Sequence, residues 1–329
     1  LNKYINKFLK SKGNKYCITD HIRSYTFAEV SEKVNFYSKL IKTINKKNPG
    51  IGILLDRNVD YLCVIFACMK VGAYYVPFSS SLIKKNLKTQ IKDSKIDLLI
   101  TYKESKHKKK IIFKKIKNDN EIRFKNLSYI IFTSGSTGKK KGVAISQNNY
   151  NCYFENISKE FKKKFKAKSL ILNGEITFDI INADLVFALI FNCHIFITYE
   201  NNNIFELCNT IVKNKIHSVY CVPSSWEKLI KISKLMGLKK LNFIKQINSG
   251  GETFSYNLYK NLRKLAPSAK IYNFYGPTEF TINSHYIEVK KNREFILDDK
   301  ISIGRPFKNT ICKINILDTK DKTGELLLK

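Results

Sequence analysis

The chain has 329 residues, 43% of them hydrophobic, so it can bury a large core as one large α/β domain or two smaller ones, which argues against disorder. Its formal net charge of +32 would suit a nucleic acid or an anionic membrane, but nearly all of it is lysine spread along the whole chain. Arginine is the residue that usually contacts phosphates and bases through two hydrogen bonds, and it is rare here. We therefore expect a solvated lysine surface and no nucleic-acid partner. The arginines are Arg23, Arg57, Arg123, Arg263, Arg293 and Arg305.

The first predicted element is a helix that begins after Thr26. Thr26 and Glu29 have the spacing of a capping box, and apolar residues follow at helical spacing up to Ile44. Pro49 and Gly50 end this helix. The run 51–55 is then typical of a buried strand, 59–69 of a helix that stops before Gly72, and 74–76 of a strand closed by Pro77.

The alternation of strands and helices continues further along the chain. Helical patterns separate the strands and fall around 180–191, 204–214, 224–235 and 255–265. The predicted strands are 98–101, 170–172, 194–198, 218–222, 244–248 and 271–274. Strands spaced by helices predict an α/β fold with largely parallel, doubly wound sheet, in which ligands bind where loops leave the carboxyl ends of the strands.

Two stretches depart from this alternation. Residues 102–125 are rich in lysine and carry few apolar positions outside 111–113, so we expect a mobile surface connection. After about residue 285 the pattern changes to short alternating runs, which predicts a β-rich region at the C-terminal end.

The spacing of the cysteines and the length of the apolar stretches indicate the cellular compartment in which we expect the protein. The eight cysteines form no C-x-x-C pair and no metal-ligand spacing, which favours reduced, buried thiols in a cytoplasmic protein. The two most apolar stretches, 61–78 and 184–199, are interrupted by polar residues, so we expect neither to span a membrane. The chain opens on Leu1 without a signal peptide, and we expect it to be an excerpt of a longer polypeptide.

The strongest local signal lies at 130–143, where a strand leads through Thr133-Ser134-Gly135-Ser136-Thr137-Gly138-Lys139 into another strand. Small residues let backbone N–H groups approach an anion, while the hydroxyls add donors and lysine adds positive charge, so this loop is suited to phosphates. Its glycine spacing excludes a Walker A loop, because only two residues separate Gly135 from Gly138. Taken alone, the loop could also be a solvated turn.

The string Thr-Ser-Gly-Ser-Thr-Gly-Lys-x-Lys-Gly at 133–142 resembles the signature of the adenylate-forming superfamily, which includes acyl-CoA synthetases, luciferases and the adenylation domains of nonribosomal peptide synthetases. Further stretches resemble other motifs of that superfamily in the family's order. They are 25–29 (Tyr-Thr-Phe-Ala-Glu), 69–77, 177–179 (Thr-Phe-Asp), 273–279 (Asn-Phe-Tyr-Gly-Pro-Thr-Glu), 303–306 and 323–326.

The resemblance implies a fold and an activity. The fold would be the large N-terminal AMP-binding domain of adenylate-forming enzymes over residues 1–329, with stacked mixed and parallel sheets, helices, and a β-rich C-terminal part. The small C-terminal lid domain, which in the family carries a catalytic lysine, would be absent. The implied reaction joins a carboxylate to ATP to give an acyl-adenylate and pyrophosphate, after which a thiol accepts the acyl group.

The resemblance also implies roles for individual residues. Thr133, Ser134, Gly135, Ser136, Thr137, Gly138 and Lys139 would hold the ATP phosphates. Thr278 would contact the α-phosphate, and Glu279 would help to bind Mg²⁺, which prefers carboxylate oxygens. Tyr275 would lie against the adenine, Asn273 would meet its amino edge, and Gly250 and Gly251 would let the backbone pass close to the base.

Asp179 indicates the kind of substrate. In the amino-acid-activating branch of the family, a residue similar in position pairs with the α-ammonium group of the substrate. Asp179 could instead only cap the helix that follows it, for which aspartate is well suited. The other positions that match the family's pocket wall are Ile180, Ala183, Ser224, Ile247, Ser249, Phe274, Ile282 and Asn283. These carry no charge, so we expect an uncharged amino-acid side chain.

Our interpretation from the sequence is therefore an amino-acid adenylation domain that uses ATP and Mg²⁺ and passes the amino acid to the phosphopantetheine arm of a carrier protein. The rival interpretations are an acyl-CoA or aryl-acid ligase of the same superfamily, a fragment that binds nucleotide without catalysis, and an RNA-binding protein, which only the net charge favours. One departure from the family is Lys140, which stands where the family usually has proline and adds charge near the phosphates.

Overall fold

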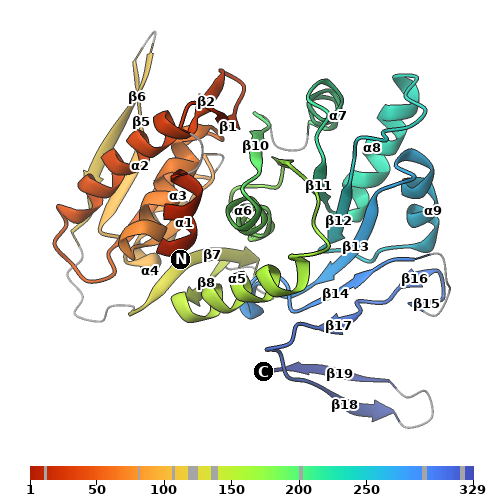
Figure 1. The fold of residues 1–329 in the computed structure, drawn as a ribbon. Helices are drawn as coiled ribbons and strands as arrows, with labels where there is room; N and C mark the ends of the chain where they lie inside the picture. The colour runs from red at the N-terminus through yellow and green to blue at the C-terminus, as the bar shows by residue number, and fades with distance from the viewer. Residues whose placement is uncertain are drawn as a thin grey trace.

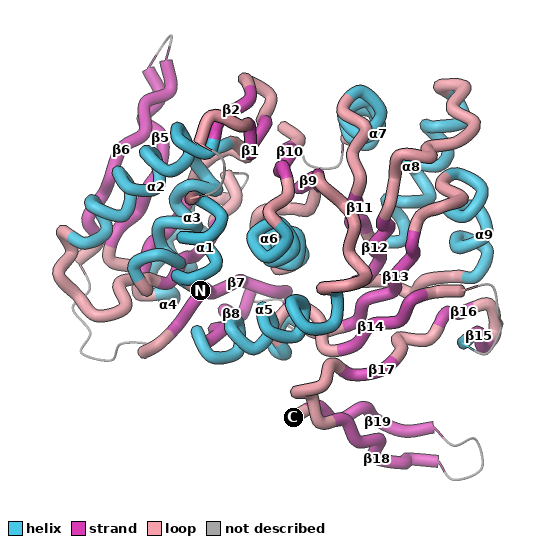
Figure 2. The backbone as a smooth tube through the Cα atoms, in the orientation of Figure 1, coloured by secondary structure: helices cyan, strands magenta, loops and turns pink. Residues whose placement is uncertain are grey.

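The computed structural model describes residues 1–10, 13–80, 82–105, 108–117, 125–134, 140–199, 203–290, 295–318 and 323–329. Two large sheets and their helices form five layers, which can be followed in Figures 1 and 2. A six-stranded sheet and a nine-stranded sheet enclose a central helical layer. The outer layers are α4 (Lys84–Ser94) on the six-stranded sheet, and α7 (Ile204–Lys213), α8 (Pro223–Leu235) and α9 (Tyr256–Leu265) on the nine-stranded sheet.

The six-stranded sheet comes from the first 146 residues. Its spatial order is β6 (Lys108–Lys115), β5 (Leu98–Ser105), β3 (Gly50–Leu54), β4 (Tyr74–Pro77), β7 (Leu127–Ser134) and β8 (Lys140–Ser146). The four inner strands run parallel, and the two edge strands run antiparallel to their neighbours. Side chains alternate between the faces, so that Tyr75 faces the central helices whereas Tyr74 and Val76 face α4.

The central layer explains why some helices are apolar on every side. It consists of α1 (Asn2–Leu9), α2 (Phe27–Lys42), α3 (Val59–Val71), α5 (Gln147–Phe161) and α6 (Ile180–Phe191). Every residue of α6 from Ile181 to Leu189 is buried, because this helix has protein around it on all sides. The predicted capping box of α2 is confirmed: the Thr26 side chain accepts a bond from the Glu29 N–H, and Glu29 accepts one from the Thr26 N–H.

The nine-stranded sheet sets the position of the site. Its order is β17 (Arg305–Pro306), β14 (His285–Glu288), β13 (Lys270–Tyr275), β12 (Gln246–Gly250), β11 (Ser218–Cys221), β9 (Ser169–Leu172), β10 (His194–Ile197), β1 (Tyr16–Thr19) and β2 (Ser24–Thr26). The strands from β13 to β1 are parallel. From β9 the chain continues to β10 on one side and later to β11 on the other. This switch of direction opens a crevice at the carboxyl ends of β9 and β11.

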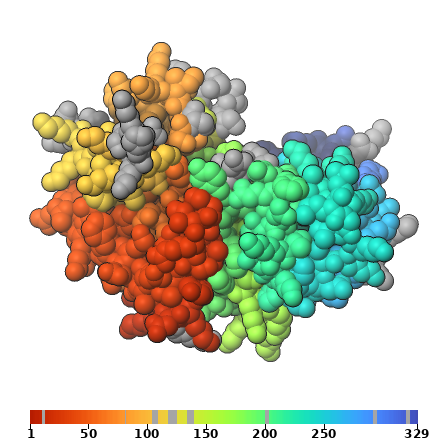
Figure 3. Space-filling model, turned by 90° about the horizontal axis from the view of Figure 1, so that it is seen from above, coloured from red at the N-terminus to blue at the C-terminus, as the bar shows by residue number. Residues whose placement is uncertain are grey.

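The two halves of the molecule share one core. Residues of α1 to α3, of both sheets and of α5 and α6 belong to the same buried cluster, while smaller clusters lie under α4 and under α7 to α9. In the space-filling view of Figure 3, the N-terminal residues and the residues coloured green to cyan pack along a single seam. Within the described residues, no helix is both long and apolar enough to cross a lipid bilayer.

The lysine-rich stretch at 102–125 differs from its prediction. Residues 102–105 and 108–115 are paired in the antiparallel strands β5 and β6, where we expected a mobile connection. The pairing is favourable because Tyr102 and Ile111 pack on the central core, while the lysines at 109, 110, 114 and 115 of the outer strand β6 remain exposed. Residues 118–124 of this stretch lie outside the described part of the chain.

The C-terminal region is rich in short strands, as predicted. The one-turn helix η1 (Thr278–Phe280) follows β13, and β14 and β17 then extend the nine-stranded sheet in the antiparallel sense. Two separate hairpins are formed by β15 (Ile296–Leu297) with β16 (Lys300–Ile301) and by β18 (Cys312–Asp318) with β19 (Thr323–Leu328). The β18–β19 hairpin projects from the rest of the molecule in Figure 1.

Candidate functional site

A cavity of about 490 Å³ lies at the crevice of the nine-stranded sheet. Its wall is formed by loops that leave the carboxyl ends of β9, β11, β12 and β13, together with the start of α6 and the segment after η1. The lining residues are Asn173, Gly174, Glu175, Phe178, Asp179, Ile180, Tyr220, Cys221, Val222, Ser225, Gly251, Glu252, Gly276, Pro277, Thr278, Ile282 and Asn283. The position agrees with the general rule for open α/β sheets.

Close backbone contacts shape this cavity, and two glycines permit them. A Cβ at Gly250 would lie 2.5 Å from the Phe274 carbonyl oxygen and 2.7 Å from the Tyr220 hydroxyl. A Cβ at Gly276 would lie 2.5 Å from the Asn283 Cα and 2.7 Å from the Ile282 carbonyl oxygen. Any side chain at these positions would therefore push the cavity walls apart.

Asp179 is the buried acid of the cavity. It precedes the first residue of α6 and is only 7% exposed, yet its side chain makes no capping hydrogen bond. Within the described residues, its Oδ2 atom has no hydrogen-bond partner at all. Burial, with a smaller contribution from the nearby charge of Glu279, raises the pKa of Asp179 to about 6, although hydrogen bonds from the Thr278 side chain and from the backbone of Asp179 and Ile282 oppose the rise. A cation that enters the cavity would find this carboxylate unpaired.

The capping alternative for Asp179 is therefore weakened by the geometry. A capping aspartate accepts a bond from an N–H of the first helical turn, and such a bond compensates for the burial of the carboxylate. Here the carboxylate is buried without it. Burying an unpaired polar group is costly, and such groups cluster at functional sites.

The turn after β13 brings two more predicted residues to the cavity. Thr278, in η1, lines the wall, while Glu279 beside it is exposed to solvent. Thr281 and Ile282 follow with φ angles of +63° and +71°, a region that β-branched residues rarely adopt. This strained backbone is held because the Ser284 N–H donates to the Tyr275 carbonyl oxygen at 2.8 Å.

The structure places some of the predicted substrate- and nucleotide-binding residues together in the cavity wall. These are Asp179, Ile180, Gly251, Thr278, Ile282 and Asn283. They come from separate stretches of the chain that only the resemblance to the family had related. Their side chains or backbones face one space that is large enough for a small organic substrate.

Other predicted residues lie behind or beside the wall. Ala183, Ile247 and Phe274 are fully buried in the apolar cores, and the buried Ser249 hydroxyl has no partner among the described residues. Gly250 is covered by Tyr220 and Phe274. Ser224 lies next to Ser225 and binds Glu252 through its backbone N–H and its hydroxyl, both at 2.9 Å. Asn273 donates to the Ser302 carbonyl oxygen at 2.9 Å, and Tyr275 is 37% exposed.

The predicted phosphate loop is only partly described. Thr133 and Ser134 end β7, and β8 begins at Lys140, so the strand on each side of the loop is present and the two pair antiparallel. Gly135, Ser136, Thr137, Gly138 and Lys139 lie outside the described residues. Their role in holding phosphates stays a prediction from the sequence.

Sequence reasoning missed several residues of the wall, including Asn173, Glu175, Phe178, Tyr220 and Glu252. The signal that could have found them is their position directly after predicted parallel strands, or within a few residues of Asp179 and Gly251. Glu175 and Glu252 add negative charge to a wall for which we had named only Asp179 as charged. Among the described lining residues, none is a lysine, an arginine or a histidine.

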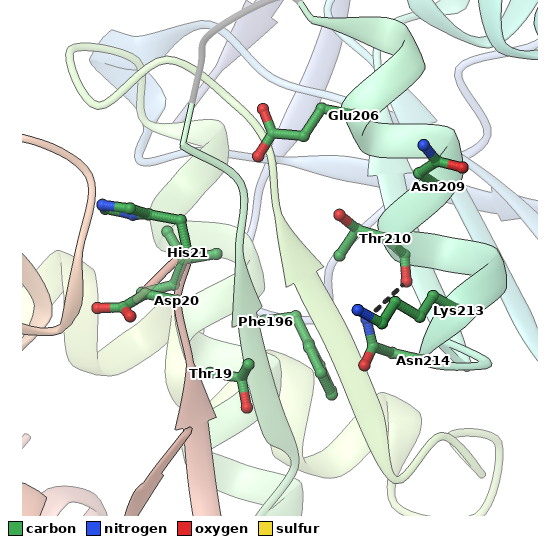
Figure 4. Close-up of a pocket in the computed structure, with 10 residues that line it drawn as sticks. Thr19, Asp20, His21, Phe196, Glu206, Asn209, Thr210, Lys213 and Asn214 are labelled. Carbon is green, nitrogen blue, oxygen red and sulfur yellow. Dashed lines mark hydrogen bonds between the residues drawn. The ribbon is translucent and has the colours of Figure 1, made fainter. Parts of the chain in front are cut away.

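A second cavity of about 520 Å³ lies between the turn after β1, β10 and α7 (Figure 4). Its acid Asp20 already accepts hydrogen bonds from the N–H groups of Ile22, Arg23 and Val59. Glu206 accepts one from the Tyr199 N–H at 2.7 Å. The Asn214 amide donates to the Thr210 carbonyl oxygen at 3.0 Å. These groups are engaged in holding the fold, so the slightly smaller cavity around Asp179 is the better candidate site.

A preformed metal site is not evident at either cavity. Within the described residues, no group of three or more His, Cys, Asp or Glu side chains is placed to hold a metal ion.

Comparison with known proteins gives a consistent result. The family model described as "AMP-binding enzyme" matches residues 6–329. The dapdiamide synthesis protein DdaD of Enterobacter agglomerans is 26% identical over 318 residues, which cover 95% of this chain and 53% of that protein. Bacitracin synthase 2 of Bacillus licheniformis is 26% identical over 353 residues, which cover 99% of this chain and 13% of that protein. The chain thus spans about half or less of the length of these relatives.

A solved structure shares the fold. The Vibrio cholerae adenylation domain AlmE, in complex with glycyl-adenosine-5'-phosphate, superimposes with a TM-score of 0.78 at 18% sequence identity. The match covers 99% of this chain and 66% of that one. At this identity the likeness concerns the fold.

Proposed function

Since the chain belongs to the AMP-binding enzyme family, as its motifs predicted, we propose that it activates the carboxylate of an amino acid with ATP and passes the product to a carrier-protein thiol. In the first step a carboxylate oxygen of the amino acid attacks the α-phosphorus of ATP, and pyrophosphate leaves. In the second step a phosphopantetheine thiol attacks the acyl carbon, and AMP leaves.

The observation that carries this proposal is the buried carboxylate of Asp179 in the cavity wall, whose Oδ2 atom has no hydrogen-bond partner among the described residues. An α-ammonium group opposite Asp179 would supply the missing partner and lower the pKa of the acid, because an opposite charge favours the ionised form. A fatty acid or an aryl acid brings no ammonium group and would leave this carboxylate buried and unpaired. AlmE, which has the same fold, was solved with a glycyl adenylate.

The nucleotide end rests on Thr278 and Glu279. Thr278 lies in the wall close enough to Asp179 to affect its pKa, so the α-phosphate and the amino acid would meet at this point. Glu279 makes no ion pair among the described residues, and its exposed carboxylate fits a magnesium ion bound together with ATP. Magnesium, when bound, supplies positive charge that offsets the charge of the phosphates.

The test compares α-amino acids with their des-amino analogues in an ATP–pyrophosphate exchange assay, on wild type and on Asp179→Ala. We expect exchange that depends on the amino group, and a loss of about 10² to 10⁴-fold in the variant, since deleting one partner of a buried ion pair typically costs about 3–5 kcal/mol. A thermal melt of both proteins serves as the folding control. A preference for the des-amino acids would instead identify an acyl-CoA or aryl-acid ligase.

A further inference from the structure

The amide of Asn283 is held in the cavity wall by two buried tyrosines. Its Nδ2 donates to the hydroxyl of Tyr153 at 2.9 Å, and the hydroxyl of Tyr220 donates to its Oδ1 at 3.3 Å. Asn283 is 7% exposed and lines the cavity, whereas Tyr153 and Tyr220 are 3% and 2% exposed. The three residues come from the segment after η1, from α5 and from β11, so parts of the chain that are far apart in sequence hold the amide together.

This arrangement leaves half of the amide's hydrogen-bonding capacity free. A primary amide offers two N–H donors and two lone pairs on oxygen, and the two tyrosines use one of each. One N–H and one lone pair therefore remain, whichever way round the amide lies. Burial raises the pKa of both tyrosines, so both phenols stay neutral and the network carries no charge.

The wall that Asn283 lines also carries apolar side chains. They include Ile282, which precedes Asn283 in the chain, and Ile180 and Cys221. When a substrate displaces water from this region, an apolar side chain would leave the free N–H and lone pair of Asn283 unpaired. A site built with buried polar groups discriminates strongly against ligands that cannot pair with them.

The two additional carboxylates of the wall do not call for a cationic side chain. Glu252 is bound by the backbone N–H and the hydroxyl of Ser224, both at 2.9 Å. Glu175 accepts a hydrogen bond from the Thr177 hydroxyl at 3.5 Å. Both acids therefore have hydrogen-bond donors in the protein, in contrast to the Oδ2 atom of Asp179.

We infer that the cavity selects an amino acid with a carboxamide side chain, asparagine or glutamine, which pairs through one donor and one acceptor with Asn283. In this inference, which rests on the proposed function, Asn283 determines specificity and Tyr153 is a positioning residue that acts through it. A carboxamide offers the complementary donor and acceptor edge in one plane, as two parallel hydrogen bonds require.

The experiment measures binding of non-hydrolysable aminoacyl-sulfamoyl adenosines by calorimetry, so it does not depend on turnover. The probes carry asparagine, glutamine, norleucine, glutamate or lysine, and one carries the des-amino analogue of norleucine. We expect the better carboxamide probe to bind at least about 10-fold more tightly than norleucine, which has a similar length and no polar end. The charged probes should bind more weakly than the carboxamide as well.

Two variants test the network. Tyr153→Phe keeps the ring that packs against Phe307 and removes only the hydroxyl, so the carboxamide preference should fall to about threefold or less while norleucine binding is unchanged. Tyr259→Phe is the matched control, because it removes a buried hydroxyl of α9 that has no partner among the described residues and does not line the cavity. It should leave the preference intact.

The outcomes separate this inference from the proposed function. If norleucine, glutamate or lysine probes bind best, or if Tyr153→Phe keeps the full carboxamide preference, the inference is wrong and amino-acid activation still stands. If the des-amino probe binds as tightly as norleucine, the ammonium site itself is absent, and the proposed function and the inference both fail.

Discussion

The guanidinium of Arg57 donates a hydrogen bond of 3.1 Å to the carbonyl oxygen of Asn173, a residue of the cavity wall directly after β9. It also donates to the carbonyl oxygen of Leu172. Arg57 is only 4% exposed, and burial lowers its pKa to about 10, so it remains charged at neutral pH. The N-terminal half of the molecule thereby holds the strand end on which the cavity is built.

Replacing Arg57 with methionine should loosen this strand end. The side chain keeps its approximate length, but the two carbonyl groups lose a charged donor, which typically costs about 1.5–3 kcal/mol of folding free energy for each such bond. Urea denaturation measures the cost. Arg23→Met is the control, since Arg23 forms an exposed ion pair with Glu29 and its replacement should cost clearly less stability. Equal costs would contradict the assigned role of Arg57.

Asp179 should destabilise the folded protein at neutral pH. Its folded pKa of about 6 lies above the usual 3.8, so the folded state loses stability as the pH rises between these values. The difference of about 2 units corresponds to about 3 kcal/mol at pH 7 and vanishes near pH 3.5. Asp179→Asn should therefore stabilise the protein at pH 7 by up to this amount.

Chemical denaturation at several pH values checks this expectation. Asp93→Asn, at an exposed position of α4, is the matched control and should show no pH-dependent gain. If Asp179→Asn is less stable than wild type at pH 7, the carboxylate has a stabilising partner and the unpaired assignment is wrong.

Amino-acid binding should weaken below about pH 6. The ammonium group of the substrate pairs with the ionised form of Asp179, and protonation of the acid removes that partner. The dissociation constant of a preferred aminoacyl probe should rise by up to tenfold for each pH unit below this pKa. Asp179→Asn should bind the probe weakly at every pH, with a flat profile. A wild-type profile that is also flat between pH 5 and 8 would exclude Asp179 as the titrating group.

Gly276→Ala should disturb the cavity more than a change at another glycine of its wall. The added methyl group would lie within 2.7 Å of backbone atoms of Ile282 and Ser284, and overpacking of this kind typically costs about 1–3 kcal/mol. At Gly174, which also lines the cavity, the nearest atom to a new Cβ is 3.8 Å away. Gly174→Ala should therefore be nearly neutral in a thermal melt. Similar losses in both variants would argue against the close approach at Gly276.

The phosphate loop can be tested although residues 135–139 lie outside the described part of the chain. Changing Ser136 and Thr137 to alanine should weaken Mg-ATP binding by about 1–3 kcal/mol, the usual cost of lost hydrogen bonds to a charged group. Calorimetry measures the affinity. Thr89→Ala on α4, where the hydroxyl donates to the Lys85 carbonyl oxygen, is the control and should bind ATP like wild type. Unchanged affinity in the loop variant would reject the assignment.

The sequence by itself determined the family and most of the alternation of strands and helices, although it did not predict α1, α4 or α5. A long apolar pattern between the polar residues Asp179 and Asn192 predicted α6 at its observed bounds, 180–191. The alternation of strands and helices was enough to predict a parallel sheet with its site at the carboxyl ends. Motif order related Asp179 to Thr278, almost a hundred residues apart, without any contact being known.

Only the tertiary structure decided which residues line the same cavity and which of their side chains have hydrogen-bond partners. Nothing in the local pattern of 102–115 indicates a hairpin, because its stability comes from the packing of Tyr102 and Ile111 on distant helices. The hydrogen bonds of the candidate site also depend on tertiary packing. The packing of distant strands and helices leaves the Oδ2 atom of Asp179 without a hydrogen-bond partner among the described residues and binds Asn283 to Tyr153 and Tyr220. Hydrogen bonds between residues far apart in sequence leave no periodic signal in the chain.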